Sequence, residues 1–201
     1  MSIVKLNNRG VRSASTFGSI SALGEMRFIS KQTASSSSTI SFTSGIDSTY
    51  KEYIFTFNNM HVSADNADFV WQANAAGGSG YNETITSAYF RSHFLEGGSD
   101  EFLIYNTTND QAQGTGFNPL LKELGYDNDQ SGSGYLHLFN PSGTTFAKHF
   151  ISKCHAHGAV DSAVTNFTAG YLNTTSAIDE VQFKMSSGDI DAGTIQLFGV
   201  A

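Results

Sequence analysis

The stretch TIQLFG at residues 194–199 alternates side chains of two kinds near the end of the 201-residue chain. Ile195 and Leu197 fall on one phase of the alternation, and Thr194 and Gln196 fall on the other. A period of two residues is typical of a β-strand that buries one face and exposes the other. This stretch therefore predicts a core strand that completes a β domain.

Similar segments recur along the chain at short intervals, separated by glycine-rich or Asx-rich turns. They lie at residues 39–43, 53–58, 69–76, 83–94, 102–105, 135–139, 146–155, 167–172 and 181–185. Many short strands at regular, turn-punctuated spacing favour a sandwich or jelly roll. We expect an all-β fold with a single β-sandwich or jelly-roll domain and at most one short helix.

The composition fits one domain without covalent cross-links. A chain of 201 residues can bury one sizeable core, and the single cysteine, Cys154, excludes an intrachain disulfide. We therefore expect synthesis in a reducing cytoplasm. The sequence shows no signal-peptide pattern and no apolar run of membrane-spanning length, so neither classical secretion nor membrane insertion is expected.

The charge is unevenly distributed, which suggests two functional parts. Residues 1–31 carry a net charge of +4, whereas the remaining 170 residues carry −11. We interpret residues 1–37 as an extended anchoring arm and linker, and residues 38–201 as the β-sandwich domain. The basic residues that would dock the arm on a partner are Lys5, Arg9, Arg12, Arg27 and Lys31. A solvated N-terminus without a partner is the alternative.

One segment in the middle of the chain predicts the short helix. Asn118, Pro119 and Gly125 flank the sequence LLKEL at residues 120–124 as an N-cap, a first-turn proline and a terminating glycine would. We expect one or two helical turns there.

The acidic loop that follows resembles the first half of a calcium-binding loop. Asp127, Asp129 and Ser131 place oxygen atoms at alternate positions before Gly132. Position twelve of such a loop supplies a bidentate glutamate, but Leu138 stands there. The interpretation favoured over calcium is an Asx-rich loop whose side chains cap their own backbone, so no cofactor is expected.

The remaining candidate residues do not form an enzyme motif. His155 and His157 would share one face of a strand and could bind zinc or nickel with His137 or His149, but ordinary surface histidines are the favoured interpretation. Cys154 is interpreted as a small buried hydrophobe. Hydrolase and phosphate-loop motifs are lacking, and six basic residues on an acidic body disfavour nucleic-acid binding. We expect a protein that is not an enzyme.

Aromatic side chains near the predicted loops suggest a lectin-like alternative. Trp71, Tyr81 and Tyr135 could stack on sugar rings at a host-surface glycan. The same residues could also serve only as part of the core.

Three stretches resemble structural proteins of marine tailed bacteriophages. They are STISFTSGIDSTY at residues 38–50, DNDQSGSGYLHLFNPSGTTFAKHF at residues 127–150, and VQFKMSSGDIDAGTIQLFG at residues 181–199. The resemblance covers most of the chain, and the last stretch is its most specific part. It brings no catalytic residues with it.

The resemblance implies a virion protein of the capsid surface or of a tail fibre, made in the host cytoplasm. Such a protein would decorate the capsid or form part of a fibre or spike, and it could aid host attachment. Its partners would be other virion proteins, reached through the basic arm. Because such proteins follow the symmetry of the particle, a homo-oligomer is expected, with a trimer as the first expectation.

Overall fold

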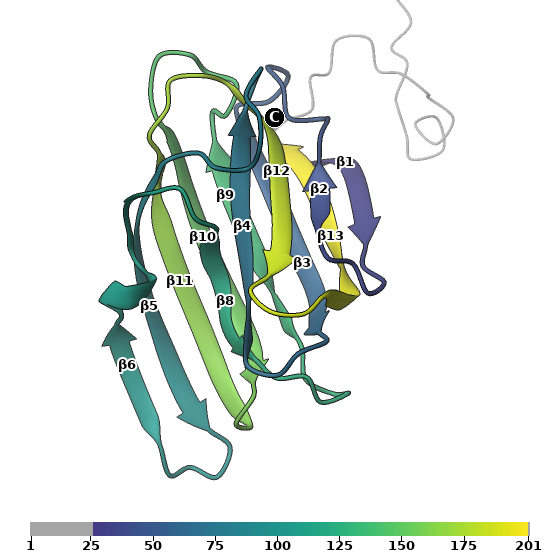
Figure 1. The fold of residues 1–201 in the computed structure, drawn as a ribbon, viewed down its shortest axis with the longest axis vertical. Helices are drawn as coiled ribbons and strands as arrows, with labels where there is room; N and C mark the ends of the chain where they lie inside the picture. Colours follow the sequence, from purple (N-terminus) through teal and green to yellow (C-terminus); the bar gives the residue numbers. More distant parts are fainter. Residues whose placement is uncertain (1–25, 201) are drawn as a thin grey trace, which may run out of the picture.

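A computed structural model describes residues 26–200, and the chain folds there almost entirely into β-strands (Figure 1). The strands are β1 (Met26–Thr33), β2 (Ile40–Phe42), β3 (Glu52–Val62), β4 (Ala67–Ala75), β5 (Ile85–Leu95), β6 (Glu101–Tyr105), β7 (Gln111–Gly114), β8 (Asn118–Leu124), β9 (Gly132–Phe139), β10 (Lys148–Gly158), β11 (Ser162–Leu172), β12 (Ile178–Met185) and β13 (Ile190–Val200). One 3₁₀ turn, η1 (Thr107–Asn109), is the only helical element among the described residues. The all-β prediction is confirmed.

The strands form two antiparallel layers. The larger layer has the order β1-β13-β3-β9-β10-β11-β5, with β6 and β7 both paired to the far side of β5. The smaller layer has the order β2-β12-β4-β8. The layers are continuous at one corner, where Leu124 of β8 pairs with Gly158 of β10, and a bridge from Ser37 to Ile190 closes the opposite corner.

The chain winds back and forth between the layers. It passes from β1 in the larger layer to β2 in the smaller, then to β3 and β4, and later from β8 to β9 and from β12 to β13. This alternation is the winding of a jelly roll. Two additions widen the larger layer: β5 to β7, and the hairpin of β10 and β11.

Aromatic rings fill the space between the layers. Phe183 of β12 packs against Phe55 and Phe57 of β3, with ring centroids 5.2 and 5.3 Å apart. Trp71 of β4 meets Phe150 of β10 at 4.9 Å. These side chains are at most 1% exposed. The alternation seen in the sequence therefore defines the face of each strand that enters the core.

The closing strand behaves as its sequence predicts. Ile195 and Leu197 are fully buried in β13, which lies between β1 and β3. Gly193 precedes them at φ +123°, in a bulge against Met60 where a side chain would be strained. Gly199 ends the stretch beneath the Tyr50 ring, and a Cβ atom there would collide with that ring.

The helix expected over residues 118–125 is wrong, because this segment is strand β8. The three leucines at 120, 121 and 124 are all fully buried, as is Asn118. A short helix at the surface would bury only one of its sides. Strand β8 instead lies between β4 and β10 in the sheet. Register shifts against β4 interrupt regular pairing around Pro119, which has no N–H to donate. Tertiary burial therefore outweighs the local capping pattern.

The boundary of the N-terminal arm also differs from the prediction. Met26–Thr33 forms β1 and pairs along its length with β13, so these residues belong to the sandwich rather than to a linker. Arg27 and Lys31 stand on this strand. Lys5, Arg9 and Arg12 lie outside the described residues.

Candidate assembly surface

The outer face of the larger layer, the side away from the core, gathers exposed apolar side chains. Twelve large hydrophobic residues are exposed among residues 26–200, and eight of them lie on this face. They are Met26, Phe28, Phe90, Phe94, Leu103, Tyr105, Tyr135 and Ile151. We call this surface the outer apolar face. Large exposed apolar patches on a soluble protein mark interaction sites.

One row of side chains crosses this face at right angles to the strands. Strand register aligns Tyr105, Phe90, Phe167, Lys153 and Tyr135 as successive neighbours. The rings of Phe90 and Phe167 stack at 4.7 Å and 7°, and the Lys153 ammonium lies 5.3 Å from the centre of the Phe167 ring. The row continues through Thr56 and Gln196 to Lys31. The contacts among Phe90, Phe167 and Lys153 hold the middle of the row in place before any partner binds.

The face is large enough to support a protein contact. Strands β5, β10 and β11 each have 11 residues, with β9 and β6 on either side. Strand spacing and rise give an area on the order of 700 Å² for these five strands. A standard protein–protein interface buries about 800 Å² per partner. The outer apolar face thus matches the scale of one binding surface.

Sequence reasoning missed this surface, although a signal was present. A strand with one buried face carries apolar residues on one phase, whereas β5 carries Tyr89 and Phe90 side by side. The run Phe102 to Tyr105 is likewise apolar on both phases. Apolar residues on both phases indicate two apolar faces, one inside the fold and one outside.

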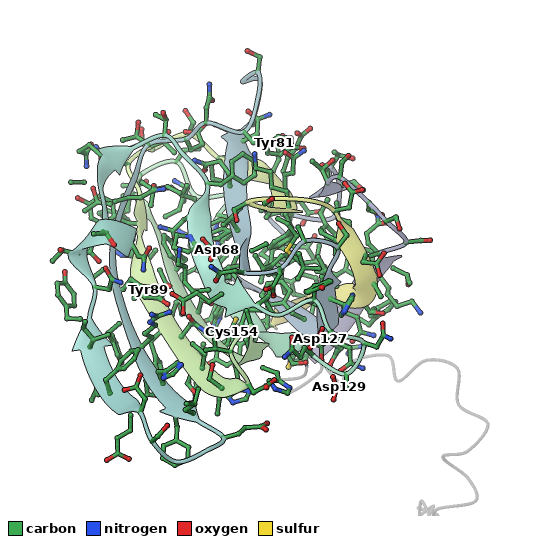
Figure 2. All side chains as sticks on the ribbon, turned by 60° about the horizontal axis from the view of Figure 1, so that its bottom comes forward. Asp68, Tyr81, Tyr89, Asp127, Asp129 and Cys154 are labelled. Carbon is green, nitrogen blue, oxygen red and sulfur yellow. The ribbon has the colours of Figure 1, made fainter. Side chains whose placement is uncertain are left out.

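The aromatic residues predicted to contact a glycan do not come together. Trp71 is wrong as a glycan contact, because it is fully buried against Phe150. The Tyr81 hydroxyl donates to Glu180 at 3.1 Å, at the β12 side of the small layer. Tyr135 stands on the outer apolar face and is 38% exposed. Figure 2 shows Tyr81 at a margin of the molecule distant from Cys154 of β10, and β10 pairs with β9, the strand that carries Tyr135.

Hydrogen bonds within the acidic loop between β8 and β9 hold its conformation. Gln130 N–H donates to the Asp127 carbonyl at 2.8 Å, and the Gln130 side chain accepts from the Asp127 N–H at 3.3 Å. The His61 ring, which also meets Asp191 at 3.3 Å, lies 3.2 Å from the Asp127 carbonyl. No group of three or more His, Cys, Asp or Glu side chains suited to a metal occurs within residues 26–200. Calcium at Asp127, Asp129 and Ser131 remains the untested alternative to an Asx-rich loop.

The side chains of His155 and His157 point to the outer side of β10, and the side chain of Cys154 points to the core. His155 and His157 share the outer face of β10, and His157 approaches Glu96 and Asp161 at 3.5 and 3.6 Å. Cys154 faces the core at 1% exposure, as expected for a small buried hydrophobe. Burial raises the pKa of its thiol to about 11. The thiol is therefore protonated and poorly nucleophilic at neutral pH.

A depression of mixed polar and apolar lining lies on the outside of the small layer, away from the outer apolar face. Its volume is about 580 Å³. Asp68, Asn109, Phe117, Lys122 and Lys184 are among its lining residues. The Asp68 carboxylate pairs with Lys122 at 2.5 Å, while Lys184 lies over the Phe117 ring at 4.2 Å. Sequence reasoning missed this grouping because its members come from four separate segments.

The fold and surface together define a single β-sandwich module with a broad apolar outer face. No family model, no curated protein and no solved structure matches this chain. Across residues 26–200, no helix has the length and apolar character needed to cross a membrane.

Proposed function

We propose that this chain is a non-enzymatic structural protein of a bacteriophage virion surface, which decorates the capsid or forms part of a fibre or spike and aids host attachment. The outer apolar face carries this proposal. It would dock on further copies or on neighbouring virion proteins, while residues 1–25 would attach the module to the particle. The protein would be made in the host cytoplasm and act in the virion.

Three features support this proposal. The outer apolar face has the area of a protein interface, and the stacked pair Phe90 and Phe167 within it is preorganised. The fold is held by packing without a disulfide, which suits cytoplasmic synthesis. The three stretches that resemble phage structural proteins include residues 181–199, which cover most of β12 and most of β13.

The proposal is tested by placing truncated chains in the phage. Deletion of residues 2–25 spares β1, so we expect a folded protein that is lost from purified particles. Replacement of Lys5, Arg9 and Arg12 by serine should reduce incorporation in the same direction. Quantitative mass spectrometry of purified virions measures both. The control is the full-length chain carrying Lys51→Ser, a basic residue of the β domain that should leave incorporation unchanged.

The outcomes separate attachment from folding. Deletion of residues 2–33 would remove β1 and expose one side of β13, so we expect a lower free energy of unfolding in that variant alone. Normal incorporation of the 2–25 deletion would contradict attachment through this segment. Absence of the full-length protein from purified particles would overturn the proposed function itself.

A carbohydrate-binding module is the second candidate, and the depression beside Lys184 favours it. Carboxylates and amides such as Asp68 and Asn109 can bind sugar hydroxyls, and the Phe117 ring offers an apolar surface. The test is a glycan array with and without calcium, repeated with Asp68→Ala. Binding that this variant abolishes would support the lectin function, and an array without bound glycans would remove it.

A further inference from the structure

Strand β6 stands out on the outer apolar face because it is apolar on both of its sides. Leu103 is 76% exposed and Tyr105 is 57% exposed, both on the outer side. Ile104 projects to the opposite side and is 43% exposed. A strand at the rim of a solvated sheet normally carries polar side chains on at least one side. The composition of β6 therefore remains unexplained by packing within one chain.

The backbone of β6 is also available for pairing. It pairs with β5 alone, in unbroken register from Glu101–Phe94 to Tyr105–Phe90, and no other described strand lies beside it. Its free side presents N–H and C=O groups in the geometry of the next strand. Proteins protect such edges with proline, lysine or a bulge, and β6 has none of these. Figure 1 shows β6 at the outer margin of the molecule, beside β5 and away from the small layer.

We propose that β6 pairs antiparallel with β6 of a second copy of this chain, about a two-fold axis at Leu103. This inference rests on the proposed role as an assembling surface protein and names the partner. In this register Leu103 meets Leu103 of the second copy, and Phe102 meets Ile104. Glu101, the sole charge on the strand, then faces Tyr105. Phe102, Leu103 and Ile104 each acquire an apolar neighbour.

Charge and direction both favour this arrangement. Antiparallel pairing separates the two Glu101 carboxylates by four residues, about 13 Å, which exceeds the screening length of about 8 Å at physiological salt. Parallel pairing in register would place them opposite each other, where like charges are destabilising. Two β6 strands are thus complementary in charge when they pair antiparallel, and not when they pair parallel in register.

The size of the contact sets its strength. Five residues of β6 span about 17 Å, so pairing buries well below the 800 Å² per partner of a standard interface. The contact is a weak one, with a dissociation constant on the order of 10–100 μM. Copies fixed on one particle reach effective concentrations in the millimolar range, where such a contact is occupied. The two-fold pairing replaces the trimer expected from the sequence, because one edge accepts one partner.

The test uses the full chain in sedimentation velocity over a concentration series up to about 500 μM. We expect a monomer–dimer equilibrium. Leu103→Lys should weaken dimerisation at least tenfold, because it places two ammonium groups opposite each other. Val160→Lys is the matched control: Val160 is 61% exposed, in the turn between β10 and β11, and its replacement should leave dimerisation unchanged. Circular dichroism should show the same fold for all three proteins.

A symmetric cross-link tests the register. Opposed Cα atoms in an antiparallel pair lie about 4.5–5.5 Å apart, within the range a disulfide spans. Leu103→Cys should therefore form a covalent dimer under mild oxidation, whereas Val160→Cys should not. The native Cys154 is buried and does not compete.

The possible results are separable. A monomer at all concentrations, a dimer unaffected by Leu103→Lys, or equal cross-linking at both positions would overturn the β6 pairing. A trimer would also overturn it, while leaving assembly through the outer apolar face intact. A dimer in a protein absent from virions would support the pairing and overturn the proposed function.

Discussion

The two ends of the larger layer are built differently. At the end formed by β3 and β13, the inner face meets the small layer and is packed with rings such as Phe55 and Phe57. At the end formed by β5 and β11, the inner face carries buried polar groups, and the Tyr89 hydroxyl donates to Asn166 at 2.5 Å. The outer face at this second end carries the stacked pair Phe90 and Phe167.

The difference follows from the width of the layers. The small layer has four strands and covers only part of the larger one. Where it covers β3 and β13, burial of apolar area stabilises the fold. Beyond it, around β5, buried polar pairs and the shorter elements η1 and β7 form the inner contacts. The outer side of this end faces away from the small layer and carries the apolar surface of Phe90 and Phe167.

The covered end should be the most sensitive to truncation. Phe183 packs against Phe42, Phe55, Phe57 and Phe69. Phe183→Ala should lower the free energy of unfolding by about 3–5 kcal/mol because it leaves a cavity among these rings. Urea denaturation measures the loss. Phe146→Ala, at a side chain 72% exposed, is the control and should change it by less than about 0.5 kcal/mol. Equal losses of unfolding free energy in the two variants would contradict the role given to the covered end.

Alkaline pH should weaken the core through Cys154. Burial raises the pKa of its thiol from 9.0 to about 11 in the folded chain, so folding favours the protonated form. This contribution is complete below pH 9 and is lost as the pH rises from 9 through 11. It amounts to roughly 3 kcal/mol at most. Urea denaturation at pH 8 and pH 10.5 should show a smaller decrease for Cys154→Ala than for the wild type. Parallel decreases would exclude Cys154 as the cause.

The uncovered end should respond to loss of a hydrogen bond. Tyr89→Phe removes the hydroxyl that donates to the buried Asn166 and should cost about 1–2 kcal/mol, since the acceptor is left unpaired. Tyr105→Phe removes a similar bond to Asp110 in solvent and should cost less. Thermal unfolding by calorimetry ranks the two. A larger effect at Tyr105 would mean that the η1 region, rather than the buried pair, stabilises this end.

Several parts of the fold were predictable from local pattern. Alternation in residues 53–58 and 194–199 identified core strands, because one phase of each strand is buried in this fold. The same reasoning failed at Asn118 and Pro119, where a helix-capping pattern sits on a strand. It also failed at Trp71, because residue type alone does not distinguish an aromatic side chain of the core from one of a binding site.

The candidate surface needed the tertiary structure. Phe90, Phe167 and Lys153 are far apart in the sequence, and only strand register makes them neighbours. The width of the small layer likewise decides which end of the larger layer is covered, and no local pattern encodes it. The exposure of Ile104 on the inner side of β6 follows from that width, and the position of β6 at the edge follows from strand order.

The sequence by itself determined the all-β class, the buried phase of the closing strand at residues 194–199, and a fold without disulfides, because these depend on residue type and spacing. The tertiary structure alone decided that residues 26–33 join the sandwich and that residues 118–124 form a strand. It also decided that Leu103 stands at a free edge. These features depend on pairing between distant segments, and the energy of strand pairing depends on the residues of both strands rather than on either strand alone.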